Sequence, residues 1–301
     1  MPLRRNALEQ LAPREPVVRL RSRLESAYQT AGSDVANLGT RRVLSAWRSR
    51  RLEPFYPLVF IDALTVSVRA NGFLTSRDIH LALGVLPDGT KDIISFWMEA
   101  PRADSFWPGA IDGLKRRGVD DILLAVVEDR ATCGEALARA FPRARIQSSV
   151  KRFEQRLLTL VPRTERSAVE ASVSGILDAP GRRSAEVAFR KFANGEFAAK
   201  NPLAQSFLRK EWRDVSLAFD LPPALRELVR TTTAVESLTA KLRRRGVAKR
   251  SNFPSEDAAA RELVLVLRDA PVSWKVAPNK WLRAQKELVQ LDTGTPFTEP
   301  S

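Results

Sequence analysis

Apolar and polar positions in the first half of the chain follow the pattern of a half-buried sheet. Residues 58–69 are rich in β-branched side chains, and residues 79–85 alternate apolar and polar positions with a period of two. The residues 87–90, Pro-Asp-Gly-Thr, have the composition of a hairpin turn, and a third apolar run follows at 93–97. The pattern predicts a meander of three antiparallel strands.

A helix and a fully buried strand are predicted after the meander. The helix has apolar positions at Phe106, Ile111 and Leu114 and is expected to end at Gly118. Residues 122–127 form a continuous apolar run, which is typical of a strand covered on both faces. The expected fold class is therefore α/β, with a mixed sheet flanked by helices.

The second half of the chain is predicted to be mainly helical. Apolar residues recur at helical spacing between 150 and 221, where Gly175 and the Pro180-Gly181 pair are expected to separate shorter helices. Pro222-Pro223 predicts the start of one more helix, and Pro254 predicts the start of another.

Acidic residues occur at three places where the apolar pattern makes them conspicuous. Asp62 interrupts the first strand, Glu128 and Asp129 follow the buried strand, and Glu236 lies at the margin of an apolar helix face. A carboxylate within an apolar strand is costly to desolvate unless a cation or hydrogen bonds compensate it, so a shared metal ion would account for the set. Taken singly, each has a more common explanation, as a turn former, a cap or a surface residue.

The composition indicates a protein that binds a polyanion. The chain of 301 residues has 49 Lys and Arg against 35 Asp and Glu, a net charge of +14 and a pI near 10.6. No apolar stretch reaches the roughly 18 residues of a membrane span, and no signal-peptide core is present, so we expect a soluble, cytoplasmic protein without membrane contact.

Scarce residues narrow the chemistry further. The only cysteine, Cys133, excludes an intrachain disulfide, and the only histidine, His80, excludes a histidine cluster. We interpret both as structural residues, so catalysis would depend on carboxylates.

Two clusters of basic residues are candidate DNA contacts. The first follows the helix of Glu236 and consists of Lys241, Arg243, Arg244, Arg245, Lys249 and Arg250. The simpler alternative is a solvated helix face, but its position beside the candidate site favours phosphate contacts. The second cluster comprises Arg41-Arg42 and residues 48–51, and the nearby Trp47 is open to either a core or a base-stacking role.

Short motifs from about residue 48 to residue 290 occur in a characteristic order. They are YPLVFIDA at 56–63, LALGV at 81–85, FW at 106–107, LKRRGVDDIL at 114–123, FP at 141–142, DLPP at 220–223, TTTAVESL at 231–238 and FPSEDAA at 253–259. Together they resemble the bacterial Mutator-type insertion-sequence transposases, a family of DDE transposases.

The resemblance implies a ribonuclease H-like fold, in which the antiparallel meander is joined by parallel strands and a helical insertion precedes the last catalytic helix. It also implies that two Asp and one Glu bind divalent metal for DNA cleavage and strand transfer. Asp62 matches the first Asp and Glu236 matches the Glu. Glu128 stands at the second Asp position, and Asp129 follows it, so we expect Asp62, Glu128 and Glu236 to be the catalytic and metal-binding residues.

The expected organisation has five parts. They are a basic helical N-terminal region at 1–53, which is a shortened DNA-binding part, the first part of the core at 54–148, the helical insertion at 149–221, the catalytic Glu helix and C-terminal helices at 222–292, and a disordered tail at 293–301.

The expected cofactor is Mg²⁺, with Mn²⁺ able to substitute, because carboxylate oxygens suit hard cations. The expected partners are double-stranded DNA, both element ends and target, and further copies of the chain as a homo-oligomer on DNA. Such a protein would be associated with the bacterial nucleoid when it is bound to DNA.

Several positions depart from the family pattern. Ser149 and Arg152 occupy places where the family usually has a Cys and a His, Thr233 stands near a usual Asn, and Glu128 replaces Asp. The N-terminal region is also short for the family. A catalytically impaired remnant that only binds DNA is therefore an alternative to an active transposase. A third alternative, an unrelated nuclease such as a junction resolvase, would cleave DNA without joining it.

Overall fold

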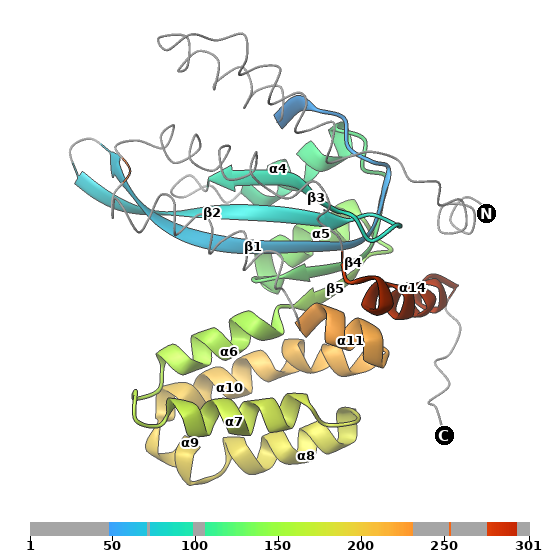
Figure 1. Cartoon of the computed structure of the whole chain (residues 1–301). Helices are drawn as coiled ribbons and strands as arrows, with labels where there is room; N and C mark the ends of the chain where they lie inside the picture. The colour runs from blue at the N-terminus through green and yellow to red at the C-terminus, as the bar shows by residue number, and fades with distance from the viewer. Residues whose placement is uncertain (1–47, 71–72, 99–105, 231–252, 254–275, 294–301) are drawn as a thin grey trace.

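A five-stranded mixed sheet forms the centre of the protein (Figure 1). The computed structural model describes residues 48–70, 73–98, 106–230, 253 and 276–293. The strand order is β3-β2-β1-β4-β5, and the strands are β1 Phe55–Ala70, β2 Phe73–Val85, β3 Lys91–Met98, β4 Asp121–Val127 and β5 Arg145–Ser148. β1, β2 and β3 pair antiparallel, while β4 pairs parallel with both β1 and β5. The predicted meander and α/β class are confirmed.

The turn between β2 and β3 forms as its sequence predicts. Gly89 donates to the carbonyl of Leu86 at 2.8 Å, and the amide of Leu86 donates to the carbonyl of Thr90 at 2.8 Å. Gly89 has a φ of 81°, a left-handed conformation that favours glycine. Trp281 lies against this turn and donates from Nε1 to the carbonyl of Pro87 at 3.0 Å.

Helices cover both faces of the sheet. One face packs on α11, Pro223–Arg230, and α14, Pro278–Thr293, in the hydrophobic cluster that includes Phe60 and Val126. The other face packs on α4, Phe106–Arg116, the π-helix η1, Arg130–Gly134, and α5, Glu135–Ala140. Because β4 contributes buried residues to both clusters, the continuous apolar run at 122–127 is explained.

Five α-helices and a 3₁₀ turn follow β5 and share a hydrophobic cluster of their own. They are α6 Val150–Thr159, α7 Arg166–Leu177, α8 Arg182–Ala193, α9 Glu196–Lys200, α10 Pro202–Val215 and η2 Ser216–Asp220, and they gather beside the sheet in Figure 1. Pro180-Gly181 separates α7 from α8 as predicted. The break predicted at Gly175 is wrong, because Gly175 lies inside α7, where buried neighbours such as Val173 and Ile176 hold the helix together.

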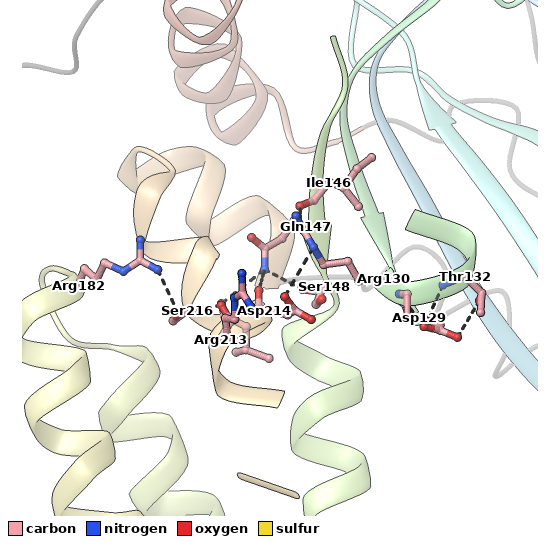
Figure 2. Close-up of polar contacts among 12 residues, drawn as sticks. Asp129, Arg130, Thr132, Ile146, Gln147, Ser148, Arg182, Arg213, Asp214 and Ser216 are labelled. Atoms are coloured by element: carbon pink, nitrogen blue, oxygen red, sulfur yellow. Dashed lines mark hydrogen bonds and ion pairs between the residues drawn. The ribbon is translucent and has the colours of Figure 1, made fainter. Parts of the chain in front are cut away.

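Polar contacts join these helices to the edge of the sheet (Figure 2). Gln147 of β5 donates from Nε2 to the carbonyls of Asp214 and Val215, at 3.4 and 3.5 Å. Arg130 of η1 donates to the carbonyl of Ile146, and its Nε lies 3.6 Å from Asp214 Oδ1. The end of α10 is therefore tied to both β5 and η1.

Some predictions fall outside the described residues. These include the helix expected at Pro254, most of the N-terminal region and the tail beyond residue 293. The boundaries of the five parts stay predictions. Within the described ranges, no helix combines the length and apolarity that crossing a membrane requires.

Candidate active site

The parallel pairing of β1 with β4 brings Asp62 and Glu128 together. Its register aligns Ile61 with Val127, so the next residue along each chain is Asp62 and Glu128. β4 ends at Val127, whereas β1 continues to Ala70. The two carboxylates therefore lie at the carboxyl end of a parallel strand, which is where open α/β sheets usually bind ligands.

A guanidinium connects the two carboxylates. Arg152 Nη2 donates to Glu128 Oε2 at 2.9 Å and to the carbonyl of Ala63 at 2.8 Å. Arg152 Nε lies 3.1 Å from Asp62 Oδ1, an ion pair whose angles do not meet hydrogen-bond geometry. Burial alone would lower the pKa of Arg152, but the charges of Asp62 and Glu128 outweigh it and raise the pKa above its usual value.

Asp129 has a different and local role. Its carboxylate accepts from the amides of Ala131 and Thr132 at 2.9 and 3.4 Å and from the Thr132 hydroxyl at 2.7 Å (Figure 2). It therefore caps η1, the short helix after β4. Glu128, and not its neighbour, is the acid that lies beside Asp62.

An open cleft of about 910 Å³ lies at this pair. Its lining carries both signs of charge, from residues that include Asp62, Asp78, Glu128, Arg139, Arg152 and Arg156. Asp78 also accepts a hydrogen bond of 2.6 Å from the Thr65 hydroxyl across β1 and β2. A substrate with anionic groups would meet arginines on the walls and carboxylates at the strand end.

The carboxylate pair fits a divalent ion in charge and in ligand type, because both side chains offer oxygen donors to one shared cation position. Two ligands do not complete a coordination sphere. Among the described residues there is no group of three or more His, Cys, Asp or Glu side chains arranged to hold a metal.

Comparison with known proteins decides the family. A family model described as transposase, Mutator family, matches residues 25–277. The chain belongs to the Mutator family of transposases. The resemblance inferred from the motifs is confirmed.

Two relatives of this Mutator-family chain are rhizobial transposases. It is 34% identical over 273 residues to the probable transposase for insertion sequence element ISRM3-like of Sinorhizobium fredii, and 34% identical over 273 residues to the transposase for ISRM3 of Rhizobium meliloti. Each alignment covers 89% of this chain and 68% of the relative. The transposase for IS256 in Tn4001 of Staphylococcus aureus is 23% identical over 258 residues, covering 81% of this chain and 63% of that protein.

Arg152 is the site residue whose contacts sequence reasoning misses. The sequence marks it only as a departure from the Mutator-family pattern. One feature of the sequence does point to Arg152. Ser149 directly follows β5 and caps α6, and Arg152 comes three residues later, in the first turn of that helix. A helix that starts after β5 begins near the carboxyl ends of β4 and β5, beside Glu128.

His80 and Cys133 take structural positions. The His80 ring packs on Phe106 and Trp107, with centroid distances of 5.4 and 4.7 Å. Cys133 is buried, and burial, followed by the charges of Asp129 and Glu128, raises the pKa of its thiol. A thiol held neutral in this way is a poor nucleophile, which agrees with the structural interpretation.

The second basic cluster is partly used inside the transposase fold. Arg50 Nη2 lies 2.7 Å from Asp92 Oδ1 and donates to the carbonyl of Ile93 at 2.8 Å. The Arg48 guanidinium stacks over the Phe96 ring at 4.9 Å from its centroid. Arg50 is therefore a structural ion-pair partner, and Trp47 lies outside the described residues.

Glu236 and the whole basic run at 241–250 also lie outside the described residues. The roles expected for them from the family resemblance stay predictions.

Proposed function

We propose that this transposase binds double-stranded DNA and catalyses metal-dependent DNA cleavage and strand transfer at Asp62 and Glu128. The observation that carries the proposal is that both carboxylates contact the same guanidinium, that of Arg152, in an open cleft at a strand end. The strand order β3-β2-β1-β4-β5, with its antiparallel meander and parallel β4 and β5, supports a ribonuclease H-like core. Relatives named as insertion-sequence transposases support the reaction class.

The carboxylates of the proposed site would hold and position the metal ion. When bound, Mg²⁺ or Mn²⁺ would supply Lewis-acid activation of the attacking hydroxyl and stabilise the leaving oxygen. Asp62 sits on a strand with neighbours on both sides, so its carboxylate has a rigid base. Glu128 lies one residue beyond β4, and Glu236 would complete the carboxylate set by the family resemblance.

Positive charge would guide the DNA. The net charge of +14 favours a polyanion, and Arg139 and Arg156 line the cleft of the carboxylates. The basic run at 241–250 would add phosphate contacts. Assembly as a homo-oligomer on paired element ends, and association with the nucleoid, belong to the same proposal.

A second candidate function is DNA binding without cleavage. Two observations favour it: Arg152 contacts both carboxylates, and Glu128 replaces the family's Asp. The extra methylene displaces a carboxylate by roughly 1 Å, and an error of that size can lower a rate by about a hundredfold.

Nicking of supercoiled plasmid separates the two candidates. Wild type, Asp62→Asn and Glu128→Asp are incubated with plasmid in Mg²⁺, in Mn²⁺ and in EDTA, while gel shifts follow DNA binding. Metal-dependent nicking by wild type that Asp62→Asn abolishes supports the proposal. If Glu128→Asp is the only one of the three proteins that nicks the plasmid, the wild-type chain is a catalytically impaired transposase.

DNA binding without nicking by any of the three proteins favours the second candidate. Joining of a labelled 3′-hydroxyl end into the plasmid separates a transposase from a nuclease that only cleaves.

A further inference from the structure

The backbone fixes the position of Arg152 beside the carboxylates. Arg152 is in the first turn of α6, where its amide donates to the Ser149 hydroxyl, the helix cap, at 3.3 Å. The Ser149 amide donates in turn to the carbonyl of Val127 at 2.7 Å. The start of α6 is thereby tied to the residue before Glu128, so Arg152 approaches the carboxylates from an anchored helix end.

The guanidinium contacts one oxygen of each carboxylate. It lies 3.1 Å from Asp62 Oδ1 and 2.9 Å from Glu128 Oε2. The side chains of Arg152, Asp62 and Glu128 are 23%, 19% and 28% exposed, so water screens these contacts only partly. A hydrogen bond to the Ala63 carbonyl at 2.8 Å holds the guanidinium further in place.

We propose that Arg152 is a built-in cation of the Asp62–Glu128 pair, which a divalent ion has to displace before it binds both carboxylates. One positive charge faces two negative charges, so the pair still attracts a cation. A guanidinium and a divalent ion repel each other and compete for the same two carboxylates, so we expect them not to share the pair. Arg152 thereby sets the affinity for the ion. This inference rests on the proposed function, in which a divalent ion is the cofactor.

Binding of Mn²⁺, followed by the electron paramagnetic resonance of the free ion, tests the displacement without relying on activity. Arg152→Gln removes the charge, and we expect it to bind Mn²⁺ about tenfold more tightly than wild type, since charge-assisted contacts no longer compete. Arg152→Lys keeps the charge and is expected to stay close to wild type. Arg156→Gln is the matched control, because Arg156 lines the same cleft from the same helix but stacks over Phe207, at 5.5 Å, and should leave the affinity unchanged.

The origin of the gain is checked with a double variant, Asp62→Asn with Arg152→Gln, in which the tighter binding should disappear. Equal affinities of wild type and Arg152→Gln would overturn the inference, as would a gain that survives in the double variant. If wild type binds Mn²⁺ and nicks DNA but Arg152→Gln binds no more tightly, only this inference fails. If neither protein binds Mn²⁺ at millimolar concentration, the proposed function fails with it.

A second measurement uses the wild-type protein and so does not depend on how a variant folds. The Arg152 Nε–H resonance is followed by NMR while Mg²⁺ is added. We expect it to shift as the ion displaces the guanidinium from Asp62. A resonance that stays in place while Mg²⁺ binds would contradict displacement.

Discussion

At the scale of single residues, Asp92 organises a buried polar group at the start of β3. It accepts from the Tyr56 hydroxyl at 2.9 Å and pairs with Arg50 at 2.7 Å. Burial raises the pKa of Tyr56, with Asp92 adding to the shift, so the hydroxyl stays a donor. Burial also lowers the pKa of Arg117 to about 10, with the charge of Arg50 as the next cause. The balance of charge in this group depends on the single carboxylate of Asp92.

Replacing Asp92 with Ala should destabilise the protein markedly. The change removes the Asp92 carboxylate from the Arg50 guanidinium, in a site where the Arg50 side chain is 14% exposed. We expect the free energy of unfolding, measured by denaturant titration, to fall by about 3 kcal/mol. Glu196→Ala is the control, because Glu196 pairs with Lys200 at an exposed site and its loss should change little. Equal stability of the two variants would contradict a structural role for the Asp92 group.

At the scale of elements, two glycines should respond to the same substitution in opposite ways. Gly89 has a φ of 81°, and an added Cβ would lie 2.7 Å from Trp281 Cδ1. Gly89→Ala should therefore lower the free energy of unfolding by about 2 kcal/mol and weaken the packing of α14. Gly175 lies within α7 with nothing inside 4 Å of its added Cβ. Gly175→Ala should raise the stability by about 1 kcal/mol.

Thermal melts of the two variants check this pair. A Gly89→Ala protein as stable as wild type would show that the turn does not need the left-handed conformation.

The sequence predicts strands best where one face is buried and the pattern alternates. The predicted segment 79–85 is the buried half of β2, but the strand begins at Phe73. Its first half pairs with the end of β1, and Phe73 and Leu74 are 77% and 54% exposed there, so no hydrophobic alternation marks it. At Gly175 the sequence predicts a helix break that does not occur, because tertiary packing of α7 outweighs the low helix propensity of glycine.

At the scale of the whole molecule, the candidate site depends on contacts between distant segments. Asp62 and Glu128 are predictable, because each interrupts or ends an apolar strand and parallel pairing brings them to one level. The contacts of Arg152 have only one signal in the sequence, its place three residues after Ser149, since they depend on where α6 begins relative to β4. The roles of Glu236 and of the run 241–250 stay predictions.

Charge makes a prediction at the same scale. Binding of duplex DNA should weaken steeply with salt, by about a thousandfold between 50 and 200 mM if some six phosphates are contacted. Arg243→Gln with Arg244→Gln should reduce the slope of log affinity against log salt by about two, which fluorescence anisotropy measures. An unchanged slope would show that these residues form a solvated face instead.

We propose that Asp62 and Glu128 together hold a divalent ion and that Arg152 takes its place in the ion's absence. Anomalous scattering from wild-type crystals soaked in Mn²⁺ tests it most directly. We expect a manganese peak within bonding distance of a carboxylate oxygen of both residues, with the Arg152 guanidinium moved off the pair. Crystals with Mn²⁺ bound elsewhere, and Arg152 still in contact with both carboxylates, would contradict it.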